Sequence, residues 1–183
     1  VTVSFSTDGA TNNGTFLESL NLAAIWNLNF ILIVENNQYA VSTTLAEATR
    51  ETKLYKRGEA IGVESHRIDG NDSLLVYETV ADAVKKCRAG LGPILIEAVT
   101  FRHSGHHVND PGKYMPAEKL KYYKDRDPVD RARNNLIQMG KMSEKDVKAI
   151  ETKIKMEFEA AVEAAENAGE VTIEEFREFV RDY

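Results

Sequence analysis

Residues 30–39 read Phe-Ile-Leu-Ile-Val-Glu-Asn-Asn-Gln-Tyr, and this stretch decides the fold. It opens with an uninterrupted apolar run, which is typical of a parallel strand buried on both faces of its sheet. Other strand-like runs lie at 1–6, 63–68 and 93–101. Helical patterns lie between them, at 15–26, 52–61 and 73–89. Strands that alternate with helices predict an α/β fold, with parallel strands joined by right-handed crossovers.

The chain changes character after residue 101. Residues 102–116 are polar and rich in glycine and proline, and a loop of this length is often functional. Three helices are predicted beyond it, at 128–139, 143–169 and 172–180. We therefore expect an α/β domain over 1–116, which includes the loop, and a helical region over 117–183.

Composition excludes several classes of protein. The 183 residues are 43% hydrophobic and 28% charged, which is the balance of an ordinary globular chain and not of a disordered one. The formal net charge of −6 argues against a nucleic-acid partner. The single cysteine, Cys87, excludes an internal disulfide and a cysteine-rich zinc site. With no long apolar run and no secretory signal, we expect a cytoplasmic protein without a membrane partner.

The first residues are unusual because Val1 already lies inside a strand-like run. Such a run usually needs strand neighbours on both sides. We expect that residues before Val1 are missing, or that the chain is the second part of a longer fold.

The first candidate site lies at 5–14, Phe-Ser-Thr-Asp-Gly-Ala-Thr-Asn-Asn-Gly, between a predicted strand and a predicted helix. Ligands of open α/β sheets bind at the carboxyl ends of strands, and helix N-termini offer free N–H groups to phosphate. Asp8 would place a hard oxygen ligand at the same point. The alternative is an ordinary turn with a helix cap.

The second candidate site, at 35–39, follows the next strand. The two strand ends would place Asp8 and Asn37 on one rim. Carboxylate and amide oxygens suit magnesium, which would in turn neutralise a diphosphate. The alternative here is a simple loop.

The third candidate is the loop Phe-Arg-His-Ser-Gly-His-His-Val-Asn-Asp-Pro-Gly at 101–112. It holds three histidines, His103, His106 and His107, which leaves zinc binding open. It also leaves open a polar loop with exposed imidazoles.

Together these residues resemble a known family. Asp8-Gly9 and Asn36-Asn37, with 27 residues between Gly9 and Asn37, resemble the thiamine diphosphate signature Gly-Asp-Gly…Asn-Asn. The intervening 18–26 is similar to the α subunit of the thiamine-dependent dehydrogenase component of pyruvate, branched-chain 2-oxoacid or acetoin dehydrogenase complexes. The resemblance covers essentially the whole chain and corresponds to about the C-terminal half of such a subunit. Further similar stretches are 55–58, 69–72 and 92–97.

The resemblance implies roles for individual residues. Asp8, the Asn37 side chain and the Tyr39 carbonyl would bind magnesium, and the amides of Gly9 and Ala10 would hold the diphosphate. The loop at 102–112 is similar to the family's Arg-x-x-Gly-His-x-x-x-Asp-Pro-Gly. In it His106 matches the catalytic histidine that faces the cofactor and substrate.

The same resemblance implies a partial thiamine diphosphate-binding fold with a helical tail. The implied activity is oxidative decarboxylation of a 2-oxoacid such as pyruvate, or cleavage of acetoin, with acyl transfer to a lipoyl group. The implied partners are a β subunit, in a heterotetramer, and a lipoyl acyltransferase component. The glutamate that activates the cofactor lies on the β subunit in this family, so we expect the isolated chain to be inactive.

Some positions depart from the family pattern. Thr7 and Ala40 replace usual glycines, Met115 stands where arginine is common, and His107 occupies the position of a regulatory serine in mammalian relatives.

Two alternatives stay open. Residues 6–11 superficially resemble the Asp-x-Asp-Gly-Thr loop of haloacid dehalogenase-like phosphatases, but position 6 is serine where that chemistry needs an aspartate nucleophile. The chain could also be a non-catalytic subunit that binds partners and has lost turnover.

Overall fold

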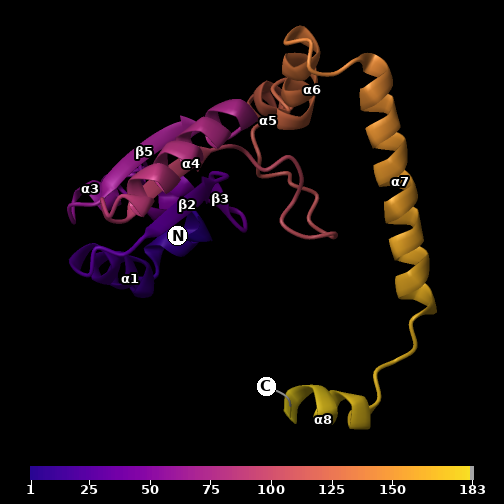
Figure 1. Cartoon of the computed structure of the whole chain (residues 1–183), viewed down its shortest axis with the longest axis horizontal. Coiled ribbons are helices and arrows are strands. Elements are labelled where there is room, and N and C mark those ends of the chain that lie inside the picture. Colours follow the sequence, from indigo (N-terminus) through magenta and orange to yellow (C-terminus); the bar gives the residue numbers. More distant parts are fainter. Residues whose placement is uncertain (182–183) are drawn as a thin grey trace. The chain divides into compact units, whose positions relative to one another are not determined.

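A computed structural model of the chain describes residues 1–181. Its centre is a four-stranded parallel sheet with the strand order β1-β2-β6-β5. Figure 1 labels β2 and β5 of this sheet. The order places β1 at one edge and β2 beside it, so the first two candidate sites share one end of the sheet. The predicted α/β fold with parallel strands is confirmed. The four strands are β1 (Thr2–Thr7), β2 (Phe30–Asn36), β5 (Glu64–Asp69) and β6 (Ile94–Val99).

Helices and one hairpin complete the chain. A short 3₁₀ helix, η1 (Gly9–Asn12), precedes α1 (Gly14–Ile25), and β3 (Tyr39–Ala40) pairs antiparallel with β4 (Thr43–Thr44). The chain divides into two compact units, one up to residue 134 and one from 135 onward. The remaining helices are α2 (Leu45–Ala48), α3 (Lys56–Glu59), α4 (Ser73–Arg88), α5 (Ala117–Lys124), α6 (Pro128–Gln138), α7 (Glu144–Asn167) and α8 (Ile173–Arg181).

Four local elements differ from the sequence-based expectation. The helix expected at 52–61 forms only over α3 and ends before Gly62, which has a φ of +78°. Helices α2 and α5 and the β3–β4 hairpin were not predicted. All three are too short to carry a clear hydrophobic period.

The sheet is covered by helices on its two faces, as a parallel sheet requires. On one face α1 buries Phe16 and Leu20 against Leu32, Val34 and Leu95. On the other face α4 packs against the opposite side chains of β2 and β6. That second cluster consists of Ile31, Ile33, Ala83, Cys87, Ile94, Ile96 and Ala98.

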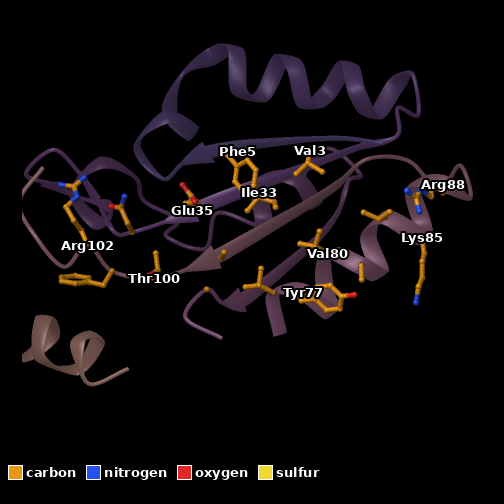
Figure 2. Close-up of a pocket in the computed structure, with 17 residues that line it drawn as sticks. Val3, Phe5, Ile33, Glu35, Tyr77, Val80, Lys85, Arg88, Thr100 and Arg102 are labelled. Carbon is orange, nitrogen blue, oxygen red and sulfur yellow. The ribbon is translucent and has the colours of Figure 1, made fainter. Parts of the chain in front are cut away.

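Helix α4 leaves the β1 end of its face open. Val3 and Phe5 are 41% and 65% exposed, and their register with Ile31 and Ile33 places them on the α4 face. They line a groove of about 1020 Å³ that extends to Lys85 on α4 (Figure 2). Within the first unit, up to residue 134, no helix covers this part of the sheet.

The second unit contains the long helix α7. A reciprocal capping box starts it: Ser143 accepts a hydrogen bond from the amide of Asp146, whose carboxylate accepts one from the amide of Ser143. Among the helices of residues 1–181, none combines the length and the apolar character that a bilayer crossing needs.

Candidate functional site at the carboxyl ends of β1 and β2

Asp8 directly follows β1 and is 1% exposed. Its Oδ1 atom is buried and makes no hydrogen bond within the described residues. Burial raises the pKa of this carboxyl, and the backbone amides of Gly9 and Gln38 oppose the rise. A buried carboxylate oxygen without a partner is costly. The position therefore suits a bound cation.

The turn after Asp8 is a single turn of 3₁₀ helix that begins at Gly9. The Thr11 hydroxyl and amide both donate to the Asp8 carbonyl, at 2.6 and 3.3 Å. From outside the turn, the Arg57 guanidinium donates to the Thr11 carbonyl and to Asn12 Oδ1. Gly9 and Ala10, the residues predicted to hold a diphosphate, therefore lie in a turn that is braced by α3.

The loop after β2 has a constrained backbone. Asn37 Oδ1 accepts from the Tyr39 amide at 3.1 Å, and Asn36 Oδ1 accepts from the Gln38 amide at 3.2 Å. Gln38 and Val41 have positive φ angles of +72° and +56°. A β-branched residue at positive φ is a real outlier, and such strain gathers at functional sites.

Hydrogen bonds from the chain after β6 hold this loop in place. The Thr100 amide donates to the Asn36 carbonyl at 2.9 Å, and Gln38 Nε2 donates to the Thr100 carbonyl at 2.7 Å. The Arg102 guanidinium donates to the carbonyls of Tyr39 and Val41, at 3.0 and 2.6 Å. These contacts from β6 and the chain after it define the shape of the loop.

The structure brings the first two predicted sites together. The turn after β1 and the loop after β2 are in contact, because a Cβ built on Gly9 would meet the Cβ of Ala40. Asp8, the Asn37 loop and the Tyr39 carbonyl therefore lie on one rim, as expected from the carboxyl ends of two consecutive parallel strands. That these groups bind a metal stays a prediction.

The third predicted site, the loop at 102–116, leaves the carboxyl end of β6 (Figure 1). Asp110 organises it by accepting hydrogen bonds from the His106 amide and the Tyr114 hydroxyl, both at 2.7 Å, and from the Gly112 amide at 2.9 Å. These bonds lower the pKa of Asp110 to about 2. The loop therefore keeps its shape at neutral pH.

The histidines of this loop do not form a metal centre. His106 and His107 are exposed, and His107 Nδ1 accepts from the Asn109 amide. No group of three or more His, Cys, Asp or Glu side chains with metal-binding geometry occurs among residues 1–181. His106 lies in the loop that begins at Arg102, and Arg102 is the residue of that loop that contacts the rim. The catalytic role of His106 stays a prediction.

Sequence reasoning missed two residues that shape the rim. Arg102 was quoted only as part of a motif, yet it holds two carbonyls of the Asn37 loop. Glu97 is fully buried in β6 and donors surround it. Its signal in the sequence was a single charge inside an apolar strand run.

Comparisons with known proteins identify the family of this chain. The family described as "Dehydrogenase E1 component" matches residues 1–174. The chain is 37% identical to "Pyruvate dehydrogenase E1 component subunit alpha" of Rickettsia bellii (strain RML369-C) over 164 residues, which are 90% of this chain and 50% of that protein. It is 37% identical to "Pyruvate dehydrogenase E1 component subunit alpha-3, chloroplastic" of Oryza sativa subsp. japonica, over 91% of this chain and 39% of that protein.

A third relative has the same name and a wider match to this chain. It is "Pyruvate dehydrogenase E1 component subunit alpha" of Porphyra purpurea, 34% identical over 98% of this chain and 52% of that protein. The chain thus spans about half the length of the curated relatives it matches. With the family match extending over nearly all of its residues, the chain belongs to the dehydrogenase E1 component family.

Proposed function

We propose that the chain forms the metal- and diphosphate-binding part of the α subunit of a thiamine diphosphate-dependent 2-oxoacid dehydrogenase. Pyruvate is the preferred substrate in this proposal because the relatives carry that name. The observation that carries the proposal is the buried, unpartnered Oδ1 of Asp8 on the same rim as the Asn37 loop. Branched-chain 2-oxoacids and acetoin are the other substrates to test.

The donor set fits a magnesium ion. Asp8 offers a carboxylate oxygen, Asn37 an amide oxygen and Tyr39 a backbone carbonyl, all hard ligands of the kind that magnesium binds together with phosphate oxygens. The Tyr39 carbonyl accepts one bond from Arg102 and has a second lone pair available. The amides of Gly9 and Ala10 would hold the diphosphate next to the ion.

Bound thiamine diphosphate supplies the nucleophilic carbon and the electron sink that 2-oxoacid decarboxylation requires. The contribution of this chain is to position that group and to manage protons. His106, exposed in a loop that Asp110 holds in shape, would donate or accept a proton at the substrate. Arg102 joins the metal-binding loop to the start of the histidine loop, so it would keep the two in register.

The proposal includes two partner proteins. A β subunit would complete the cofactor site in a heterotetramer and provide the glutamate that activates the cofactor. A lipoyl acyltransferase component would receive the acyl group. The proposed location is the cytoplasm.

The test is a titration of thiamine diphosphate and magnesium into the complete assembly, followed by tryptophan fluorescence and calorimetry. Wild type, Asp8→Asn and Asp82→Asn are compared. Asp82 lies on α4, and its contact is a surface ion pair with Lys86. We expect Asp8→Asn to weaken binding at least tenfold and Asp82→Asn to match wild type. No binding by wild type would favour the non-catalytic partner-binding alternative.

A further inference from the structure

Glu97 is a charged residue in the most buried strand of the sheet. It lies in β6 between apolar neighbours and has no exposed surface. Its register pairs it with Val34 on β2 and with Arg67 on β5. A buried carboxylate destabilises a fold unless it is paired and hydrogen-bonded, so its partners indicate what it does.

The three polar groups that contact the Glu97 carboxylate are all hydrogen-bond donors. Oε1 accepts from Asn36 Nδ2 at 2.6 Å, and the Arg67 Nε atom lies 3.5 Å from the same oxygen. Oε2 accepts from the Tyr55 amide at 3.0 Å. An ionised carboxylate, which only accepts hydrogen bonds, satisfies all three. A neutral amide at this position would turn one of its own N–H groups toward another donor.

The first oxygen of Glu97 fixes the metal-binding loop. Because Glu97 Oε1 accepts a hydrogen bond from Asn36 Nδ2, the other side-chain atom, Asn36 Oδ1, faces the Gln38 amide and accepts from it at 3.2 Å. The loop that contains Gln38 also reaches the turn after Asp8, because a Cβ built on Gly9 would meet the Cβ of Ala40. Glu97 therefore determines which way the Asn36 amide points, and with it the left-handed backbone at Gln38.

Oε2 of Glu97 is connected, through α3, to the turn at Gly9–Asn12. Tyr55 is the N-cap of α3, and two residues further on Arg57 donates to the Thr11 carbonyl and to Asn12. Fixing the Tyr55 amide therefore fixes the start of the helix that braces the turn at Gly9–Asn12. One buried side chain is joined to both halves of the rim.

We propose that Glu97 is a positioning residue. It holds the loop at residues 36–41, which would bind magnesium, in register with the turn at Gly9–Asn12, which would bind the diphosphate. This proposal rests on the proposed function, since it assigns Glu97 to the same cofactor site. Glu97 touches neither cofactor nor substrate in this assignment. It acts through Asn36 on one side and through Tyr55 and Arg57 on the other.

The first test is Glu97→Gln in the complete assembly, with the half-saturating magnesium concentration measured at fixed thiamine diphosphate. The substitution keeps the size of the side chain and removes one acceptor. Groups that orient metal ligands typically change metal affinity by about 10- to 100-fold, and we expect a rise in this range. The matched control is Ile96→Val, a neighbour in the core cluster on the opposite face. It should lower the thermal unfolding temperature and leave the magnesium requirement unchanged.

A double substitution tests whether the direction of the hydrogen bond between residues 36 and 97 matters. In Glu97→Gln with Asn36→Asp, the amide introduced at 97 donates to the carboxylate introduced at 36 and still accepts from the Tyr55 amide. The carboxylate at 36 still accepts from the Gln38 amide. We expect this pair to recover most of the magnesium affinity that Glu97→Gln loses, which a simple loss of packing would not allow.

Hydrogen exchange of the cofactor-free assembly gives a second, independent readout. Glu97→Gln should speed exchange in residues 36–41 and 9–13 and leave α4 unchanged, whereas partial unfolding would speed it everywhere. Unchanged exchange in the two segments, or an equal magnesium requirement in wild type and Glu97→Gln, would overturn the proposal. If wild type binds no cofactor, the proposed function fails, and the exchange result alone then decides the role of Glu97.

Discussion

A Cβ built on Gly9 would lie 2.6 Å from the Cβ of Ala40, closer than such atoms approach in folded proteins. The space between positions 9 and 40 therefore accommodates only one methyl group. The contact joins the turn after β1 to the loop after β2, which are the two halves of the proposed cofactor site. The alanine at 40, where the resembled family usually has glycine, is accommodated because position 9 is glycine.

Gly9→Ala should destabilise the protein by about 1–3 kcal/mol, the usual effect of overpacking. Adding Ala40→Gly should recover most of this loss because it removes the opposing methyl group. Calorimetric unfolding of the assembly without cofactor measures both effects, with Ala40→Gly alone as control. If the double variant is no more stable than Gly9→Ala, the contact is not the cause.

Asp8 predicts a specific pH dependence. Its pKa is raised in the folded protein by burial, so the folded state binds the proton more readily than the unfolded state. Stability that depends on Asp8 should therefore fall as pH rises from the ordinary carboxyl pKa through the raised one.

The comparison to make is the unfolding temperature of wild type minus that of Asp8→Asn, in the absence of magnesium and cofactor, from pH 3 to pH 7. This difference should become less favourable to wild type as pH rises, and magnesium with thiamine diphosphate should reverse the trend. A difference that stays flat with pH would show that the carboxyl is not desolvated.

His106→Ala should lower kcat by about 100-fold or more, the usual range for loss of a general acid or base, with little change in cofactor affinity. His107→Ala should have a much smaller effect, because His107 Nδ1 only accepts a bond from the Asn109 amide within the loop. Steady-state rates of the two variants in the complete assembly decide this. A larger loss for His107→Ala would mean that the register of the loop is misassigned.

Val41→Gly should raise stability. Left-handed backbone costs about 1–2 kcal/mol for a residue with a Cβ, and the extra flexibility of an unfolded glycine offsets about 0.5–1 kcal/mol of the relief. We therefore expect a net gain of up to about 1.5 kcal/mol, measured by calorimetry. Ala40→Gly, at a position without positive φ, should show the entropic loss alone.

The chain by itself should show no dehydrogenase or decarboxylase activity, even with saturating thiamine diphosphate and magnesium. The proposed cofactor site is shared with a β subunit, and the β1 end of the sheet is uncovered within residues 1–134. Pyruvate, a branched-chain 2-oxoacid and acetoin would be assayed with an artificial electron acceptor, before and after addition of the β subunit. Robust turnover by the chain alone would contradict the shared site.

Much of the fold could be predicted because its signals are local and strong. The apolar run at 30–34 and the helical pattern at 73–89 both appear within a few residues of their expected bounds. The hairpin of β3 and β4 could not be predicted, since Arg102 and Thr100 hold its backbone from more than 60 positions away along the chain. Tertiary contacts of this kind leave no local pattern.

The candidate site, like the fold, could be predicted only in part from the sequence. Asp8 and Asn37 follow strand-like runs, so their shared rim could be inferred from topology alone. The role of Glu97 could not, because its partners Asn36 and Tyr55 become neighbours only when β2, β6 and α3 pack together. A charge inside an apolar strand indicates that a partner exists and does not say which one.

The open groove along β1 has a consequence for the life of the protein in the cell. Phe5 and Val3 face solvent there, and β1 is an edge strand among the described residues. Exposed apolar surface beside a free strand edge invites chaperone binding, aggregation and proteolysis. Whatever covers that surface in the complete protein should therefore also protect the chain from aggregation and proteolysis.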